Sequence, residues 1–317
     1  MDRADHVPVL LRRVVDLVAP VLEHEDAVLV DATLGLGGHT EAVLRRCPQA
    51  RVVGVDRDPQ ALESARQRLG DLADRVTFVH AVYDEIEATL AGLGITRIDA
   101  ALFDLGVSSL QLDRVERGFA YATDAPLDMR MDATSGTRAA DVLATYSQDE
   151  LTRVLRDYGE ERFAKRIAAA IVRARRDAPL ERTGQLVELV RDAIPAPARR
   201  RGGHPAKRTF QALRIEVNHE LDALRRALPQ AIDAVCVGGR LVVLSYHSLE
   251  DRMVKRQLAS RSRSSLPEGL PVRSDEAQAE WRLLTRGAEQ ASDEEVAANP
   301  RARSVRLRAA ERLREAA

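Results

Sequence analysis

A glycine-rich segment follows a short apolar run near the N-terminus. Val28–Val30 leads into Asp31, and the chain continues Thr33-Leu34-Gly35-Leu36-Gly37-Gly38-His39. Glycines let a ligand approach the backbone closely, and the free N–H groups of a following helix offer it hydrogen bonds. The next apolar run ends in Asp56, and a carboxylate at that place accepts both hydroxyls of a ribose. These residues predict a site for a nucleoside cofactor, with a merely tight strand–helix turn as the alternative.

Thr40 helps to choose between two nucleoside cofactors. A dinucleotide-binding loop of the form G-x-G-x-x-G that begins at Gly35 has its third glycine at the position of Thr40. The threonine weakens the dinucleotide interpretation, and the loop by itself suits either a dinucleotide or S-adenosylmethionine.

A second polar motif, Asp104-Leu105-Gly106-Val107-Ser108-Ser109, follows the apolar run Ile98–Phe103. Amino-group methyltransferases place a short polar motif beside the methyl donor at this point of the chain. An exocyclic amine conjugated to a base ring is a poor nucleophile, and a carboxylate that accepts its N–H bonds localises the lone pair and removes the proton. Asp104 is therefore our candidate catalytic residue. A loop carboxylate that caps neighbouring N–H groups is the structural alternative.

Three further clusters have structural as well as functional interpretations. The acids of 124–132 alternate with Leu and Met, which favours structural ion pairs, and we predict no metal site. Basic residues beside Phe210 could hold a phosphate while the ring stacks on a base, but core packing of Phe210 is an equal alternative. The cluster 245–252 follows an apolar run without the G-x-S-x-G pattern of a hydrolase, so His247 is either a structural histidine or a contact to the base.

The elements that would position these residues alternate along the first part of the chain. Strand-like runs at 28–31, 51–56, 76–79 and 98–104 are separated by helical segments, and strand character returns at 241–245. This pattern predicts an α/β, Rossmann-like parallel sheet whose strands carry ligands at their carboxyl ends. Only helical periodicity is found from 134 to 206. We therefore predict one domain formed by 1–133 and 207–317, with an inserted all-helical domain at 134–206.

Composition narrows the class of protein. The only cysteines are Cys47 and Cys236, which excludes a disulfide framework and a cysteine-based zinc cluster. The sequence lacks both an apolar run of the ~20 residues that span a bilayer and the pattern of a signal peptide, so we expect a cytoplasmic protein without a membrane partner. The net charge is −1, yet 153–214 carries 16 basic and 7 acidic residues. This asymmetry is typical of a polyanion-binding surface, with solvated helix faces as the alternative.

Together these segments resemble one family, the bacterial small-subunit rRNA cytosine-N4 methyltransferases of the RsmH or MraW type. A single fragment is a weak signal, whereas the ordered set is highly specific. Tyr246 stands where phenylalanine is common in the family, and Ala120 stands where serine is common. The matching segments span nearly the whole chain and are His6–Leu11, the glycine loop with Asp56–Asp58, Phe103–Asp132, Tyr158–Glu161, His204–Glu220, Ser245–Lys255 and Asn299–Ser304.

The resemblance implies a class I methyltransferase with a helical insertion and S-adenosyl-L-methionine as donor. It implies N4-methylation of a decoding-centre cytidine, cytidine 1402, of 16S rRNA in the small ribosomal subunit. We expect the insertion to serve substrate recognition. Carried over by position, the donor-binding residues are Gly37, Gly38, His39, Asp56, Tyr83, Asp104 and Gln111. The residues that we expect to contact RNA are Ser108, Arg208, Phe210, His247, Arg252, Arg301 and Arg303.

Direct transfer to the amine, without a covalent intermediate, is the mechanism that we expect. Methylation at carbon 5 of cytosine would need a cysteine nucleophile, and neither cysteine lies in one of these motifs. The Asp/Asn-Pro-Pro-aromatic tetrad of DNA amino-methyltransferases is absent, which disfavours that class. A non-catalytic RNA-binding assembly factor and, more distantly, a nicotinamide-dependent oxidoreductase stay as alternatives. The sequence leaves the oligomeric state open, with a homodimer among the alternatives.

Overall fold

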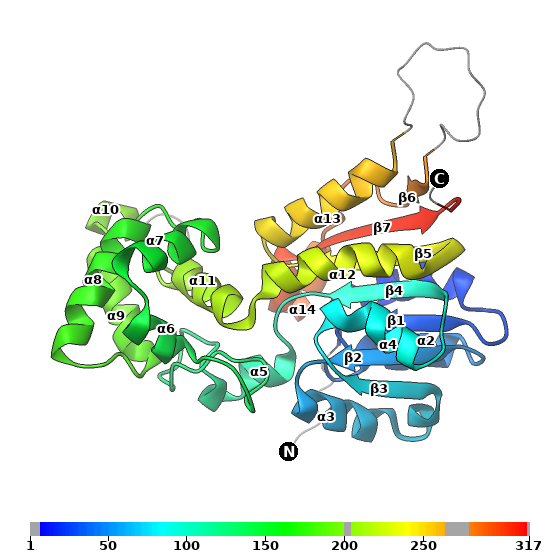
Figure 1. The fold of residues 1–317 in the computed structure, drawn as a ribbon, viewed down its shortest axis with the longest axis horizontal. Coiled ribbons are helices and arrows are strands. Elements are labelled where there is room, and N and C mark those ends of the chain that lie inside the picture. The colour runs from blue at the N-terminus through cyan, green and yellow to red at the C-terminus, as the bar shows by residue number, and fades with distance from the viewer. Residues whose placement is uncertain (1–6, 200–203, 264–278, 316–317) are drawn as a thin grey trace, which may run out of the picture. The chain divides into compact units, whose positions relative to one another are not determined.

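The chain forms two compact units (Figure 1). The computed structural model describes residues 7–199, 204–263 and 279–315, so His6, where the resemblance begins, lies outside the described residues. Unit 1 comprises 1–106 together with 222–317, and unit 2 comprises 107–221.

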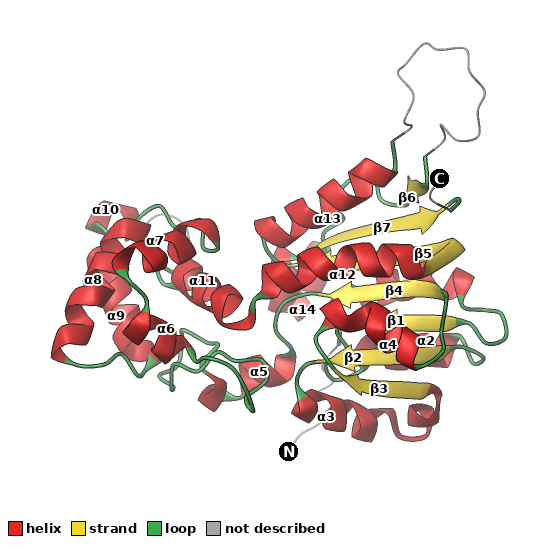
Figure 2. Ribbon diagram, in the orientation of Figure 1, coloured by secondary structure: helices red, strands yellow, loops and turns green. Residues whose placement is uncertain are grey.

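Unit 1 is built on a seven-stranded sheet with the order β3-β2-β1-β4-β5-β7-β6 (Figure 2). Strands β1 to β5 pair in parallel, whereas β7 pairs antiparallel with β5 and with β6. The strands are β1 (Val28–Asp31), β2 (Arg51–Asp56), β3 (Val76–His80), β4 (Ile98–Asp104), β5 (Val235–Ser245), β6 (Trp281–Leu283) and β7 (Arg306–Arg312).

Both faces of this sheet are buried, which explains why its strands are apolar at consecutive positions. Leu29 packs into one core cluster with α1 (Leu11–Val18) and α2 (Gly38–Arg46). The next residue, Val30, packs into another cluster with α4 (Ile86–Gly92), α12 (Glu220–Ala234) and α13 (Ser248–Arg261). Helix α3 (Pro59–Leu69) begins at the expected cap, because the side chain of Asp58 accepts a hydrogen bond from the Gln60 N–H.

The sequence pattern missed the two strands after α13. Strand β7 buries Leu307, Ala309 and Ala310 between its charged residues, so its sequence lacks the continuous apolar run by which the other strands were expected. Arg308 donates a hydrogen bond to Asp251 at 2.7 Å, so its charge is paired within the fold. Strand β5 also begins at Val235, earlier than expected.

Unit 2 is helical in its described part, apart from an isolated bridge between Pro126 and Arg182. Its apolar core contains the buried side chains of the helices, among them Phe210, together with Phe119 and Leu127 from a loop. The helices are α5 (Ser109–Asp113), α6 (Ala139–Thr145), α7 (Gln148–Asp157), α8 (Ala164–Asp177), α9 (Thr183–Ala193), α10 (Ala196–Arg199) and α11 (Lys207–Asn218).

This compact unit is wider than the insertion at 134–206 that helical periodicity suggests. Asn218 accepts a hydrogen bond from the Met131 N–H at 2.7 Å and donates one to the Met129 carbonyl at 2.8 Å, so α11 holds the loop before residue 134. Periodicity could not include that loop, because side-chain contacts and not helical repeats join it to the unit. Among the described residues, no helix is long and apolar enough to cross a membrane.

Candidate active site

Three acidic residues end three neighbouring strands of unit 1. Asp31 ends β1, Asp56 ends β2 and Asp104 ends β4. Because these strands are parallel and adjacent in the order β2-β1-β4, the three carboxylates lie at one edge of the sheet. This is the edge at which ligands bind in open α/β sheets.

The glycine loop crosses that edge with backbone angles that suit glycine. Gly37 has a φ of 74° and caps α2. A Cβ atom on Gly38 would lie 2.4 Å from Cγ of Pro8, so the N-terminal segment sits directly against the loop. The loop is therefore closely packed on the side of Pro8, and there is no room for a side chain at Gly38.

Asp56 is held by the backbone around it. Its Oδ2 accepts a hydrogen bond from the Gly35 N–H at 2.7 Å, and its Oδ1 accepts one from the Asp58 N–H at 2.8 Å. Each carboxylate oxygen has a further lone pair, so the group can still accept two ribose hydroxyls. Burial raises the pKa of Asp56 to about 6, against the opposing effect of the two N–H donors.

Thr40, the residue that departs from the dinucleotide pattern, has a hydrogen-bond partner in Asp31. The Thr40 hydroxyl donates a hydrogen bond to Oδ2 of Asp31 at 2.7 Å, and the Thr33 N–H donates to Oδ1 at 3.3 Å. Burial raises the pKa of Asp31, which is 2% exposed. Thr40 thus satisfies a buried carboxylate at the start of α2.

The backbone N–H of Asp104 and its two carboxylate oxygens each have a different neighbour. Its N–H donates a hydrogen bond to the Thr33 hydroxyl at 2.6 Å, and its Oδ1 accepts one from the Tyr246 hydroxyl at 2.6 Å. Its Oδ2 lies 3.7 Å from Nδ1 of His39, and its side chain is 25% exposed. Burial raises the pKa of Asp104, whereas His39 and Tyr246 act to lower it. A partly exposed carboxylate with a raised pKa is suited to accept the proton of an amine.

Tyr246 is a site residue that sequence reasoning did not select. It follows β5, and burial together with the neighbouring Asp104 holds the pKa of its phenol well above its ordinary value. Tyr246 therefore stays a neutral hydrogen-bond donor to Asp104. Its departure from phenylalanine was the signal in the sequence, because a hydroxyl added in a buried place needs a partner.

Of the two interpretations of His247, its contacts favour the structural one. Its side chain is 7% exposed, its Nδ1 accepts a hydrogen bond from the Glu250 N–H at the start of α13, and its Nε2 lies 3.1 Å from Oε1 of Glu250. Glu250 in turn accepts a hydrogen bond from the Tyr246 N–H at 2.8 Å. The predicted contact of His247 with RNA is not available in this arrangement, and the histidine instead fixes the turn that carries Tyr246.

Other predicted donor residues divide between the units. Tyr83 follows β3 in unit 1 and packs edge-on against Phe103, with ring centroids 5.9 Å apart. Gln111 belongs to unit 2, where it forms a reciprocal cap of α5 with Ser108, a residue that we expect to contact RNA. The Gln111 N–H donates to the Ser108 hydroxyl, and the Ser108 N–H donates to Oε1 of Gln111 at 3.0 Å.

The predicted RNA contacts differ in their exposure. Phe210 is 4% exposed and packs edge-on against Tyr121, so it is a core residue and cannot stack on a base without leaving the core. Arg208 is exposed and donates a hydrogen bond to the Glu160 carbonyl at 3.1 Å. Arg252 and Arg303 are exposed, and Arg301 is half-buried.

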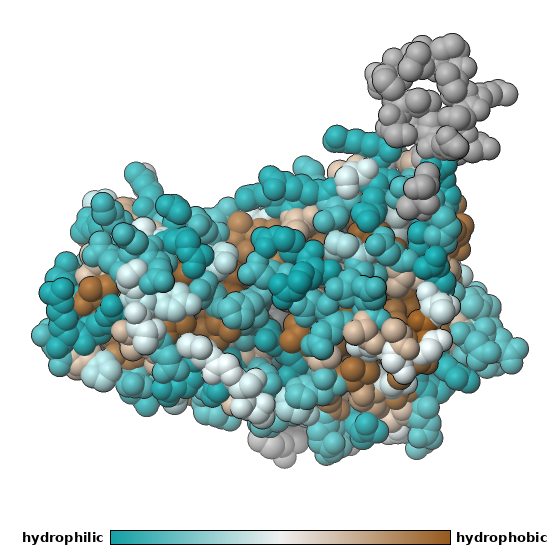
Figure 3. All heavy atoms as spheres, viewed as in Figure 1, coloured by the Kyte–Doolittle hydropathy of each residue, from teal (hydrophilic) through white to brown (hydrophobic). Residues whose placement is uncertain are grey.

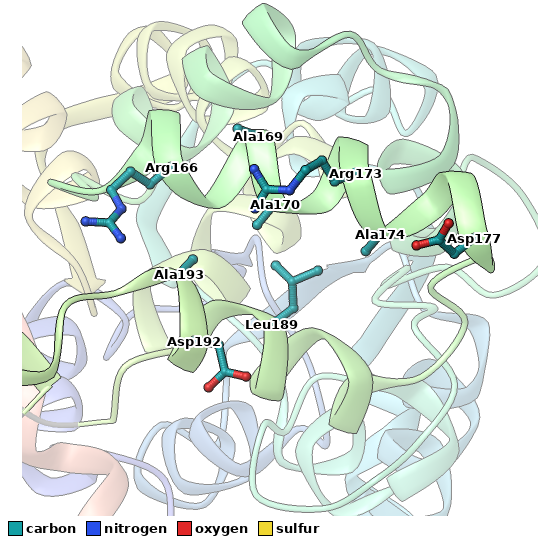
Figure 4. A pocket seen from close by; sticks show the side chains of 9 residues that line it. All are labelled: Arg166, Ala169, Ala170, Arg173, Ala174, Asp177, Leu189, Asp192 and Ala193. Atoms are coloured by element: carbon teal, nitrogen blue, oxygen red, sulfur yellow. The ribbon is translucent and has the colours of Figure 1, made fainter.

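Unit 2 also carries an open groove that the sequence analysis did not foresee. It encloses about 660 Å³ between α8 and α9 (Figure 4). Ala169, Ala170 and Ala193 are among the small residues that line it, and the exposed Arg166 and Arg173 extend from α8 beside them. Hydrophilic residues dominate the face of unit 2 that is seen in Figure 3. Asp177 and Asp192 line the groove as well, so its two arginines are matched by two acids.

The acids of 124–132 are used inside unit 2. Asp128 forms an ion pair with Arg130 at 2.8 Å, and Asp124 forms one with Arg182 at 2.6 Å. Within the ranges that the structure describes, no group of three or more His, Cys, Asp or Glu side chains is placed to hold a metal ion.

The fold and the site together define a class of protein. Antiparallel β7 between β5 and β6, the glycine loop after β1, the ribose-type carboxylate after β2 and the polar motif after β4 are those of a Rossmann-like methyltransferase that uses S-adenosylmethionine. Residues 3–313 match the MraW methylase family, and the chain belongs to that family.

Two curated relatives agree with this assignment over 99% and 100% of the chain. The protein named ribosomal RNA small subunit methyltransferase H from Saccharopolyspora erythraea is 65% identical over 314 residues, which cover 99% of this chain and 95% of that protein. The protein of the same name from Nocardioides sp. is 64% identical over 317 residues, 100% of this chain and 99% of its own. Among solved structures, an rRNA methylase from Streptococcus thermophilus is 14% identical, with a TM-score of 0.45 over 97% of this chain and 99% of that chain.

Proposed function

We propose that the protein transfers a methyl group to the N4 amine of cytidine 1402 of 16S rRNA in the small ribosomal subunit. The names of its relatives support the choice of small-subunit rRNA as substrate. The place of this substrate puts the protein in the cytoplasm, where ribosomal subunits are assembled.

The observation that carries the proposal is the position of Asp104. Its carboxylate lies at the ligand edge of the sheet, it is partly exposed, and its raised pKa suits it to hold an amine N–H. Neither cysteine lies at this edge: Cys47 is buried after α2, and Cys236 lies near the start of β5, at the opposite end from Ser245. This supports attack by an amine over attack through a cysteine adduct at carbon 5.

The residues present fit S-adenosylmethionine. Asp56 has free lone pairs for the two ribose hydroxyls, and the Gly35–Gly38 backbone gives a ligand close access to the start of α2. Gly37, Gly38 and His39 would hold the methionine end, and Tyr83 would line the rest of the part that unit 1 contributes. The bound donor would supply an electrophilic methyl group. The chain itself has to orient the amine and receive one proton, and in this proposal Asp104 does both.

RNA would be held mainly by exposed or half-buried arginines. Arg208, Arg252, Arg301 and Arg303 remain in the proposed set, and Arg166 and Arg173 of the groove join it. Phe210 and His247 are better assigned to the core and to the cap of α13. The target base has to leave its stack to reach Asp104, and backbone contacts from unit 2 would help to offset that cost.

The decisive experiment measures methyl transfer from labelled S-adenosylmethionine to unmethylated small subunits, followed by mass spectrometry of the nucleosides. We expect N4-methylcytidine at position 1402. Asp104→Asn should lower the rate by about 100-fold or more and leave donor affinity within about threefold, because it removes the proton acceptor but keeps the side-chain shape. Asp71→Asn, an exposed acid before β3 at the opposite edge of the sheet, is the matched control and should keep full activity.

Other products would redirect the assignment. 5-Methylcytidine, or methylation of naked duplex DNA in preference to subunits, would contradict the proposed atom and substrate. Tight donor binding without transfer to subunits, rRNA or DNA would favour the non-catalytic assembly factor instead.

A further inference from the structure

A chain of four groups runs through the site, and the proposed function uses two of them, Asp104 as proton acceptor and His39 beside the donor. Nε2 of His39 lies 3.0 Å from the Val9 carbonyl, and Nδ1 of the same ring lies 3.7 Å from Oδ2 of Asp104. The other oxygen of Asp104, Oδ1, accepts the hydrogen bond of the Tyr246 hydroxyl at 2.6 Å. The groups thus follow one another as Val9 carbonyl, His39, Asp104 and Tyr246.

The Val9 carbonyl fixes the orientation of His39. A carbonyl oxygen can only accept a hydrogen bond, so Nε2 carries a hydrogen and the lone pair of neutral His39 is on Nδ1, facing Asp104. The ring is 6% exposed, which leaves little freedom to turn. The backbone beside Val9 is held from the other end of the chain, because the Leu10 N–H donates to Glu295 at 2.6 Å and the Asn299 amide donates to the Val7 carbonyl at 3.2 Å.

We propose that His39 and Tyr246 are positioning residues that make Asp104 an effective proton acceptor, with His39 taking up the proton that the methylated amine releases. This inference rests on the proposed function. When the amine nitrogen bonds to the methyl carbon, the bond from that carbon to the sulfonium sulfur would break and its electron pair would stay on the sulfur, which leaves as a neutral thioether. The amine nitrogen would become cationic, and one N–H proton would pass to Oδ2 of Asp104. The proton then moves to Nδ1 of His39, which becomes an imidazolium and restores the Asp104 carboxylate.

The surrounding charges favour a proton on this pair. Asp31 from β1, Glu250 from α13 and Glu295 from α14 (Asp293–Ala298) are the acids that face the group. Tyr246 contributes a neutral hydroxyl that stabilises the ionised form of Asp104 at Oδ1 and leaves Oδ2 for the amine and His39. A separation of 3.7 Å is within ion-pair distance but beyond that of a hydrogen bond, so the proposed transfer requires a small approach of the two side chains.

The first test needs neither donor nor RNA. In protein labelled with ¹⁵N-histidine, the resonances of His39 are identified by their loss in His39→Gln. We expect neutral His39 to carry its hydrogen on Nε2, because the Val9 carbonyl accepts a hydrogen bond there. A hydrogen on Nδ1 of neutral His39 would overturn the proposal.

The second test is kinetic and separates binding from proton transfer. His39→Gln keeps a donor for the Val9 carbonyl but removes the lone pair that faces Asp104. We expect kcat at saturating donor to fall about 10-fold, with the pH–rate profile displaced, and Tyr246→Phe to displace the profile toward higher pH because Asp104 loses a hydrogen bond to its ionised form.

The outcomes distinguish this inference from the proposed function. Wild-type protein that forms no N4-methylcytidine would contradict the proposed function, whatever the state of His39. Wild-type protein that forms it, while both variants keep the wild-type pH profile, would contradict the role of His39 and Tyr246 alone. A rise in donor KM without a change in kcat or in the profile would assign His39 to donor binding only.

Discussion

Asp56 shows how a single carboxylate can couple donor binding to pH. Burial raises its pKa to about 6, above the ordinary value of 3.8. The native state therefore binds a proton more readily than the unfolded state, and the contribution of Asp56 to the free energy of unfolding falls as pH rises from about 4 to about 6. Hydrogen bonds from ribose hydroxyls to the ionised form would recover part of that cost.

This leads to a prediction for donor affinity. Lowering the pH from about 7 to about 5 should weaken S-adenosylmethionine binding about 10-fold, because protonation removes an acceptor for the ribose hydroxyls. Isothermal titration calorimetry across this range would measure the effect. In Asp56→Asn, affinity should be lower at pH 7 and nearly flat below it. A wild-type affinity that stays constant down to pH 5 would show that Asp56 does not hold the ribose.

Phe210 illustrates a residue whose type permits two roles and whose burial decides between them. Because the ring lies in the core of unit 2, Phe210→Ala should lower the free energy of unfolding by about 3–5 kcal/mol, measured by chemical denaturation. Phe210→Leu should lose much less stability and keep RNA affinity. If Phe210→Leu folds with wild-type stability but binds RNA weakly, the ring contacts a base after all.

At the scale of elements, the glycine loop depends on a segment from the start of the chain. In Gly38→Ala, the new Cβ would meet Pro8 at 2.4 Å and displace the residues around Val9. We expect a loss of about 1–3 kcal/mol in the free energy of unfolding, as for other overpacked sites, together with weaker donor binding.

A matched glycine provides the control for this prediction. An added Cβ at Gly92, which ends α4, meets nothing within 4 Å, so Gly92→Ala should leave donor binding unchanged and stability equal or slightly higher. Thermal unfolding and donor titration of both variants make the comparison. Equal behaviour of the two variants would contradict close packing of Pro8 on the loop.

The strands also show which elements an apolar sequence pattern can predict and which it cannot. The strands β1, β2 and β4 are apolar runs that end in an acid, and their bounds follow from the sequence as expected. Strand β7 places arginines between buried apolar residues, so its sequence is compatible with an exposed basic segment as well as with a strand. Pairing with β5 and the contact of Arg308 with Asp251 decide for the strand.

For the whole molecule, charge is distributed unevenly although the sum is −1. If the arginines of unit 2 contact phosphates, methylation of subunits should fall steeply as salt rises. Replacing Arg166 and Arg173 by Gln should weaken RNA binding and reduce the slope of log affinity against log salt by about 1.4–1.8, the value for two phosphate contacts. Filter binding at several salt concentrations would measure this slope.

The control for this experiment removes the same charge elsewhere. Arg45 and Arg51 are 68% and 71% exposed and lie in unit 1. Their double replacement by Gln should leave the slope unchanged. Equal slopes for both double variants would mean that the groove between α8 and α9 takes no part in RNA binding.

The sequence by itself determined the α/β class, the strands that end in Asp31, Asp56 and Asp104, and the family, because apolar periodicity, glycine spacing and motif order are local properties of the chain. Only the tertiary structure decided that Tyr246 and His39 meet Asp104 and that Phe210 is buried. It also decided that α11 belongs with the loop before residue 134. These outcomes depend on contacts between residues far apart in the chain, which no local pattern records. A buried polar group takes whichever partner the packing brings within hydrogen-bond distance.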